Sequence, residues 1–168
     1  MIDNDTKKTV LRMIPYGLYV LTTHGANDQL AAAAVNWVTQ ASFKPPLLAV
    51  AVRGDSFAYT LIQESGVFAL NVLGKEHAAT AFAFFKPTIR DAMTLSGEPF
   101  HYGETGSPIL DRAPAFIECR VSGLLSLGDH TLFLGEVAAV GLSQLLQGRP
   151  DDAILALRDL GANIFYGG

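Results

Sequence analysis

The sequence predicts a mainly β fold with short helices, arranged as an antiparallel, Greek-key-like barrel. The chain holds about six or seven short segments that are rich in β-branched and aromatic residues, and turn residues separate them. Only two segments favour a short helix. Many short strands with few helices are typical of antiparallel barrels. The 168 residues suffice to bury a full core, so we expect a single domain over residues 1–168.

The first part of the chain is expected to form three strands. Residues 17–23 (GLYVLTT) are aromatic and β-branched, and residues 24–29 (HGANDQ) form a turn-rich loop. In residues 31–42 (AAAAVNWVTQAS) the alanines favour a helix by propensity, but the valines, Trp and Thr favour the strand that we expect. The diproline Pro45-Pro46 cannot donate to a ladder, so it ends that strand before a buried strand at 47–52.

The middle of the chain is expected to alternate between helix and strand. Residues 56–66 (SFAYTLIQESG) favour a short helix that Ser56 or Asp55 caps and Gly66 ends. Residues 67–73 (VFALNVL) predict a strand, and residues 75–84 favour a second helix. Residues 86–112 contain several Gly and Pro, and we expect a long loop region there.

The last part of the chain predicts a hairpin and an ambiguous tail. Two β-rich runs at 115–127 and 131–140 meet at Gly128-Asp129-His130, which is a turn signal. Residues 151–161 (DDAILALRDLG) have an acidic start and a glycine stop, which locally favour a helix. The same segment could equally form a last strand at 153–158 that closes the barrel.

Composition excludes several classes of function. The net charge of −4 argues against nucleic acid and anionic membrane as partners. Cys119 is the only cysteine, which excludes an internal disulfide, a structural zinc cluster and a Cys-ligated iron–sulfur cluster. His24, His77 and His101 have no clustered spacing, so we assign them neither metal binding nor catalysis.

Charge content and the N-terminus bear on assembly and location. Charged residues make up 17% of the chain against 49% apolar residues, so we expect a partner subunit to cover some apolar surface. The first ten residues (MIDNDTKKTV) have no apolar signal segment, and no apolar run is long enough to span a membrane. We therefore expect a cytoplasmic protein.

Polar residues precede the most apolar strand and suggest a ligand site. Thr39, Gln40 and Ser42 lie where a buried surface would normally exclude hydroxyls and amides, so we expect a polar group to meet them. Arg53 ends the apolar strand, and the turn after it opens a helix whose N-terminus favours anions such as phosphate. Ser56 and Thr60 share a face of that helix. The structural alternative is a capped surface helix with a solvated arginine.

Four blocks of sequence together resemble one family. They are YGLYVLTT, NWVTQASFKPPLLAVAV, SFAYTLIQESGVFALNVL and GDHTLFLGEV. The chain resembles the flavin reductase-like family, whose members are FMN-binding split β-barrels, from about residue 10 to residue 168. It is most similar to stand-alone flavin reductases and to the flavin domains of high-molecular-weight rubredoxin and diflavin flavoproteins. The tail pairs as a strand in that family, which favours a strand at 153–158. The lack of CxxC pairs excludes a fused rubredoxin-like iron centre.

The resemblance implies a set of site residues. The expected contacts to flavin or its phosphate are Asn36, Trp37, Val38, Thr39, Ser42, Arg53, Ser56, Thr60, Asn71, Phe85 and Lys86. His130 is the expected nicotinamide contact. Structural alternatives remain open for four of them. Trp37 could be a core or dimer-interface aromatic, and Asn71 a buried amide bonded to backbone. Lys86 could be merely solvated, and His130 could be an exposed turn histidine.

The resemblance also implies the activity. It is that of an NAD(P)H:flavin oxidoreductase, a homodimer that binds FMN, with FAD as the alternative flavin, and uses NADH or NADPH. Reduced flavin or electrons would pass to an oxygenase or another electron acceptor. The sequence contains no GxGxxG fingerprint, no Ser-His-Asp arrangement and no paired carboxylates, and flavin reduction requires none of them. The alternatives are an electron-transfer flavoprotein or ferric reductase with tightly bound FMN, and a non-redox ligand-binding barrel.

Overall fold

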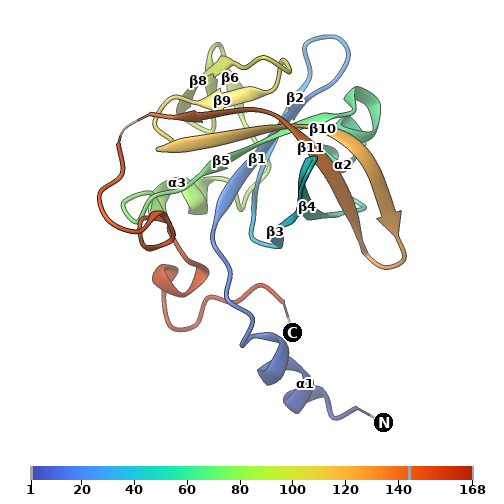
Figure 1. Cartoon of the computed structure of the whole chain (residues 1–168), viewed down its shortest axis with the longest axis vertical. Coiled ribbons are helices and arrows are strands. Elements are labelled where there is room, and N and C mark those ends of the chain that lie inside the picture. The colour runs from blue at the N-terminus through green and yellow to red at the C-terminus, as the bar shows by residue number, and fades with distance from the viewer. Residues whose placement is uncertain (1, 144, 168) are drawn as a thin grey trace.

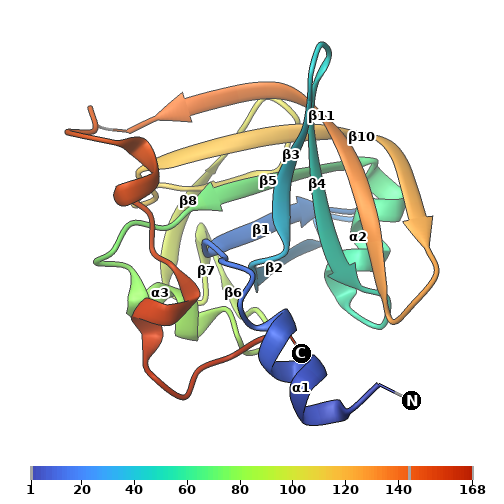
Figure 2. The same ribbon diagram turned by 60° about the horizontal axis from the view of Figure 1, so that its bottom comes forward.

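Seven antiparallel strands form one sheet, which curls into a barrel (Figure 1; Figure 2). The computed structural model describes residues 2–143 and 145–167. The strand order across the sheet is β2-β1-β5-β10-β11-β4-β3. The strands are β1 (Tyr19–His24), β2 (Leu30–Val35), β3 (Val38–Phe43), β4 (Pro46–Arg53), β5 (Val67–Val72), β10 (Ala115–Ser126) and β11 (His130–Leu142). The expected mainly β, antiparallel barrel is therefore confirmed.

The barrel closes through a corner of the chain. Strands β2 and β3 are the two edges of the sheet, yet only Asn36 and Trp37 separate them along the chain. The chain therefore crosses from one edge to the other at this corner, where no ladder joins the edges. The single strand expected over residues 31–42 is wrong in this respect, because a continuous strand would have stayed beside one neighbour.

The edge of β2 that faces away from β1 is covered by a later segment of the chain. The hydroxyl of Thr88 accepts a hydrogen bond from Ala32 N (3.2 Å) and donates one to Ala32 O (2.6 Å). Two residues further on, Ala34 N donates to Phe84 O (3.1 Å). The segment from Phe84 to Thr88 therefore takes the place of a neighbouring strand.

Helix α2 (Phe57–Ser65) packs against the barrel and completes its inner core. Ser56 caps its N-terminus, since Ser56 Oγ accepts from Tyr59 N (3.1 Å), and Gly66 ends it at φ 69°. Asp55, the alternative cap, forms other contacts. The inner core includes Leu21, Val50, Leu61, Ile62, Phe68, Leu70, Cys119 and Phe133. Burial raises the pKa of the Cys119 thiol to about 12, which leaves it protonated and unreactive at neutral pH.

The outer face of the sheet carries a second core. Neighbours on β1 point to opposite faces, so Leu21 lies inside the barrel while Val20 packs outside it. Helix α3 (Ala78–Ala83) covers this outer face and is shorter than the helix expected at 75–84. The loop region expected at 86–112 is wrong. A small sheet of β6 (Arg90–Asp91), β7 (Thr94–Leu95), β8 (Glu98–Tyr102) and β9 (Pro108–Leu110) forms there, with the Gly and Pro residues between very short strands.

A buried carboxylate ties the small sheet to the barrel. Glu118 on β10 is 1% exposed. It accepts hydrogen bonds from Glu104 N (3.0 Å), Thr105 N (2.7 Å) and Thr105 Oγ1 (2.6 Å). These three donors replace the water that the carboxylate loses on burial, and they fix the loop between β8 and β9.

The β10–β11 hairpin forms as expected, with His130 as the first residue of β11. The strand expected at 153–158 does not form. Two 3-10 turns, η1 (Pro150–Asp152) and η2 (Leu157–Leu160), flank isolated bridges at Ile154 and Ala156. Strands β1 and β5 already pair with each other from Tyr19 and Val72 onward, so the tail meets only the residues outside those ends.

An N-terminal helix that the sequence analysis did not expect lies outside the barrel (Figure 1). Helix α1 (Asn4–Leu11) is capped by Asp3 and has no buried residues. It lies near the C-terminal end of the chain in both views (Figure 2). Within residues 2–143 and 145–167, no helix has the length and apolar character needed to cross a membrane.

Candidate functional site

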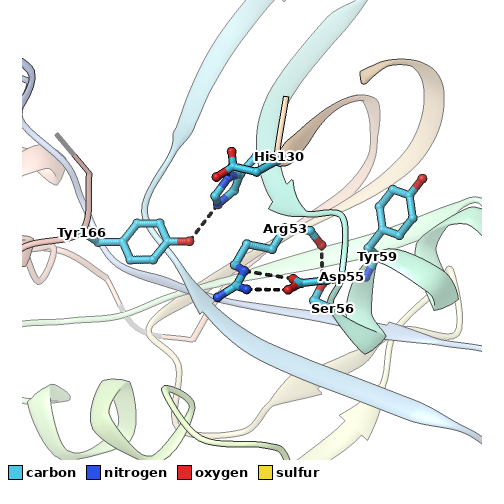
Figure 3. A network of polar contacts seen from close by, with 7 residues as sticks. Arg53, Asp55, Ser56, Tyr59, His130 and Tyr166 are labelled. Carbon is cyan, nitrogen blue, oxygen red and sulfur yellow. Dashed lines mark hydrogen bonds and ion pairs between the residues drawn. The ribbon is translucent and has the colours of Figure 1, made fainter. Parts of the chain in front are cut away.

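Three aromatic side chains from distant parts of the chain meet beside the corner between β2 and β3. The ring of Trp37 lies 4.6 Å from that of His130 and 5.3 Å from that of Tyr166, measured between centroids. His130 Nε2 lies 2.8 Å from the Tyr166 hydroxyl (Figure 3). The corner, the start of β11 and the C-terminal tail therefore contribute one residue each to a common site.

The pairing of β4 with β11 brings the second half of the site to the same place. His130 lies opposite Arg53 in the ladder, and Gly54 N donates to Asp129 O (3.0 Å). The hairpin turn thus adjoins the turn that opens α2. Together these turns and the tail form an open pocket of about 650 Å³, lined by Arg53, Gly54, Asp55, Gly128, Asp129, His130 and Tyr166.

Arg53 is held by Asp55 rather than free. Its Nε and Nη2 atoms donate to Asp55 Oδ1 (3.0 Å) and Oδ2 (2.5 Å), as Figure 3 shows. This hydrogen bonding raises the pKa of Arg53 and lowers that of Asp55. The side chains are 58% and 68% exposed, so water screens the pair. The pair does not use Nη1, so the guanidinium keeps donors for a further acceptor.

The hydroxyl of Ser56 is committed to the local structure. Besides capping α2, it donates to Arg53 O (2.8 Å), which fastens the helix to the end of β4. Thr60 lies on the same face, one turn further on, and is exposed. The cap of the structural alternative is therefore present, although Arg53 is paired with Asp55, and phosphate binding by Ser56 and Thr60 stays a prediction.

His130 is not the solvated turn histidine of the structural alternative. Its side chain is 13% exposed, and its Nδ1 lies 2.9 Å from Asp129 Oδ1. The same contact lowers the pKa of Asp129. A carboxylate only accepts, so Nδ1 carries a proton, and in the neutral ring Nε2 is the acceptor that faces Tyr166.

Two adjacent donors at the corner are buried without a partner. Asn36 Nδ2 and Trp37 Nε1 have no hydrogen-bond acceptor within the part of the chain that the structure describes. Asn36 is 4% exposed, so water does not reach its amide freely. An unpaired buried donor costs roughly 1–3 kcal/mol. A ligand with acceptor atoms at this place could accept hydrogen bonds from both donors.

The remaining residues expected on β3 lie along an exposed edge. Val38 is half-buried and pairs with Val50. Thr39 and Gln40 are exposed and Ser42 is half-buried. Within a single copy of the chain, the expected buried polar surface is therefore wrong. The cause is the position of β3 at the end of the sheet, with β4 on one side only. Any role of Thr39 and Ser42 in ligand binding stays a prediction.

Asn71 fits its structural alternative. Its Nδ2 donates to Val20 O (3.1 Å) and Thr22 Oγ1 (3.1 Å), and its Oδ1 accepts from Leu110 N (2.8 Å). These bonds use the amide within the core, so the structure does not bring Asn71 to the site. Phe85 and Lys86 are exposed at the end of α3. The bond from Ala34 N to Phe84 O places them beside the end of β2 that leads to Asn36.

The sequence analysis missed Asp129 and Tyr166 as site residues. Asp129 directly precedes His130, and its acidic side chain beside a histidine was a usable signal. Tyr166 lies 36 residues after His130 in a tail without periodicity, and only its aromatic character next to glycines set it apart. Within the described residues, no cluster of three or more His, Cys, Asp or Glu side chains could hold a metal ion.

Comparisons with known proteins agree on one family. The family model described as a flavin reductase like domain matches residues 11–155. A flavin reductase (NADH) from Kitasatospora aureofaciens is 32% identical over 84% of this chain and 73% of its own length. Diflavin flavoprotein A 1 from Synechocystis is 33% identical over 81% of this chain, which spans only 24% of that longer protein. The styrene monooxygenase flavin reductase from Pseudomonas putida S12 superposes with a TM-score of 0.70 at 26% identity, over 83% of this chain and 87% of that one.

The contacts at the turn after β4 predict two different effects on stability. Ser56→Ala removes the cap of α2 and should lower the free energy of unfolding by roughly 0.5–2 kcal/mol. Asp55→Asn weakens an exposed ion pair and should change it by less than about 1 kcal/mol. Urea unfolding followed by circular dichroism measures both. A Ser56→Ala variant as stable as the parent would contradict the assigned cap.

Proposed function

The chain belongs to the flavin reductase-like family, and from this premise we propose that it is an NAD(P)H:flavin oxidoreductase that binds FMN and supplies reduced flavin to an acceptor. The observation that carries the proposal is the pair of unpartnered donors, Asn36 Nδ2 and Trp37 Nε1. The indole of Trp37 packs against His130, which lies opposite Arg53 in the ladder. A flavin ring has acceptor atoms along its polar edge, which suit such donors. The site residues present therefore fit a flavin, and one domain, residues 1–168, carries the whole proposed site.

The two ends of the site have different proposed roles. Asn36 and Trp37 hold the polar edge of the ring, with backbone groups of Val38 and Thr39 beyond them along β3. Arg53 holds the flavin phosphate through Nη1 while Asp55 keeps Nε and Nη2. Ser56 and Thr60 lie at the helix N-terminus that faces this phosphate. Phe85 and Lys86, beside the end of β2, and Ser42 complete the proposed contacts.

His130 lies on the nicotinamide side of the proposed site. Asp129 fixes the orientation of the imidazole, and His130 lines the open pocket. When bound, FMN supplies a ring that accepts a hydride from the nicotinamide, so the protein has to provide position rather than acid–base groups. We also propose that the flavin is FMN rather than FAD and that NADH or NADPH is the reductant. The proposed location is the cytoplasm.

A flavin carrier that another protein reduces is the second candidate. The similarity to diflavin flavoprotein A 1 favours it, because this chain matches only a part of that protein. Anaerobic mixing of the FMN-loaded protein with NADH or NADPH separates the two candidates. The expected result is a rapid loss of the absorbance that oxidised flavin has in the blue part of the spectrum. If neither nicotinamide causes a loss of absorbance, the protein is a flavin carrier. If the protein binds no flavin, it is a ligand-binding barrel without redox function.

The proposed acceptor is an oxygenase partner, by analogy with the styrene monooxygenase flavin reductase. We also propose a homodimer. The turn end of the β10–β11 hairpin exposes Leu124, Leu125, Leu127 and Leu132, apolar side chains that a second subunit would cover. Sedimentation velocity should give a dimer. A monomer at micromolar concentration would exclude the homodimer and leave the activity untouched.

Variants separate the two ends of the site. Arg53→Ala should weaken FMN binding by roughly 1.5–3 kcal/mol, because a charged donor to the phosphate is lost. His130→Ala should bind FMN almost normally and be reduced more slowly by NADH. Flavin titration and stopped-flow reduction measure these effects. Arg149→Ala is the matched control, since Arg149 forms the same bidentate pair with Asp151, outside the pocket. Normal FMN binding by Arg53→Ala together with its loss in His130→Ala would reverse the proposed orientation.

A further inference from the structure

The C-terminal tail lies across the part of the site that the nicotinamide would use. Tyr166 places its hydroxyl 2.8 Å from His130 Nε2 (Figure 3). Its ring centroid lies 5.3 Å from that of Trp37. Burial raises the pKa of Tyr166, so its hydroxyl stays protonated and can donate to the neutral imidazole. The other ring nitrogen is already committed to Asp129. A ligand can therefore form a hydrogen bond with a ring nitrogen of His130 only after Tyr166 has left Nε2.

The described part of the tail covers the Trp37 ring but provides no hydrogen-bond acceptor for its Nε1. Gly167 packs against the indole: a Cβ atom at this glycine would lie 3.5 Å from Trp37 Nε1. The same Nε1 is buried and has no acceptor in the part of the chain that the structure describes. The closed position of the tail thus leaves a donor unpaired, and a ligand that supplies an acceptor would remove this cost.

Besides the contacts of Tyr166 and Gly167 with His130 and Trp37, contacts with Arg12 fasten the tail. Arg12, just after α1, donates from Nε to Gly167 O (3.2 Å), and its guanidinium lies 4.5 Å from the centre of the Phe165 ring. Phe165 and Tyr166 are both half exposed. Helix α1, to which Arg12 belongs as the C-terminal cap, has no buried residue of its own. Exposed contacts of this kind open at low cost, in contrast to the core strands.

We propose that residues 165–167 form a strap, fastened by Arg12, that occupies the nicotinamide side of the site and competes with the nicotinamide for His130 and Trp37. The strap rests on the proposed reductase function. The apparent affinity for NADH then equals the intrinsic affinity multiplied by the fraction of molecules in which the strap is open. Tyr166 is then a residue that controls access, and Arg12 acts through the strap without contacting the ligand.

Trp37 is the only tryptophan in the chain, so its fluorescence reports directly on the strap. In the flavin-free protein, Tyr166→Ala and Arg12→Ala should both increase quenching of Trp37 emission by acrylamide, because each uncovers the indole. Tyr166→Phe keeps the ring and should increase quenching less. Tyr102→Ala and Arg112→Ala remove side chains of the same types elsewhere on the surface and should match the parent.

Steady-state kinetics complete the test. Tyr166→Ala and Arg12→Ala should lower KM for NADH about 3- to 10-fold with kcat nearly unchanged, since a competing conformation is removed. Quenching equal to that of the parent in both variants would overturn the strap. Increased quenching with a raised or unchanged KM would also overturn it, and would make the tail a wall of the site. These failures leave the reductase function standing, whereas a parent that oxidises neither NADH nor NADPH in the presence of FMN overturns that function and the strap together.

Discussion

The two-residue connection between β2 and β3 is the constraint on which the rest of the site depends. Asn36 and Trp37 carry the chain from one edge of a seven-stranded sheet to the other. Both residues lie between the strands, and Asn36 Nδ2 and Trp37 Nε1 have no hydrogen-bond acceptor in the described part of the chain. The antiparallel register of β4 and β11 places Arg53 opposite His130, whose ring contacts Trp37. The chemistry of the site is thus a consequence of how the sheet closes.

Sequence reasoning succeeded where a signal was local. Ser56 and Gly66 cap α2 at the expected positions, and the β10–β11 hairpin turns at the expected Gly-Asp step. It failed where contacts between distant parts of the chain determine the local structure. The corner at Asn36 lies inside a run of continuous β propensity, the strands of the small sheet are too short to show a period, and the tail finds its neighbours already paired. The contact of Tyr166 with His130 has no local signal at all.

The electrostatics of the site rest on internal pairs. Arg53 is bound by Asp55, and Asp129 is bound by His130, so each charged group at the mouth of the pocket already has a partner. An anion that binds there meets no isolated carboxylate, although both carboxylates are close. Because the Arg53–Asp55 pair is exposed and screened, Arg53 can interact with a phosphate more readily than an arginine in a buried pair could. The geometry therefore tolerates an anionic ligand in an acidic protein.

The cover that Thr88 and Phe84 give to β2 has a consequence for self-association. A free sheet edge is a template on which a strand of another molecule can add and aggregation can begin. On β2 the outward groups of Ala32 and Ala34 already have partners within the chain. The opposite edge, β3, is interrupted by a register shift between Gln40 and Ser42. Each edge of the seven-stranded sheet therefore has a feature that hinders the addition of a strand from another molecule.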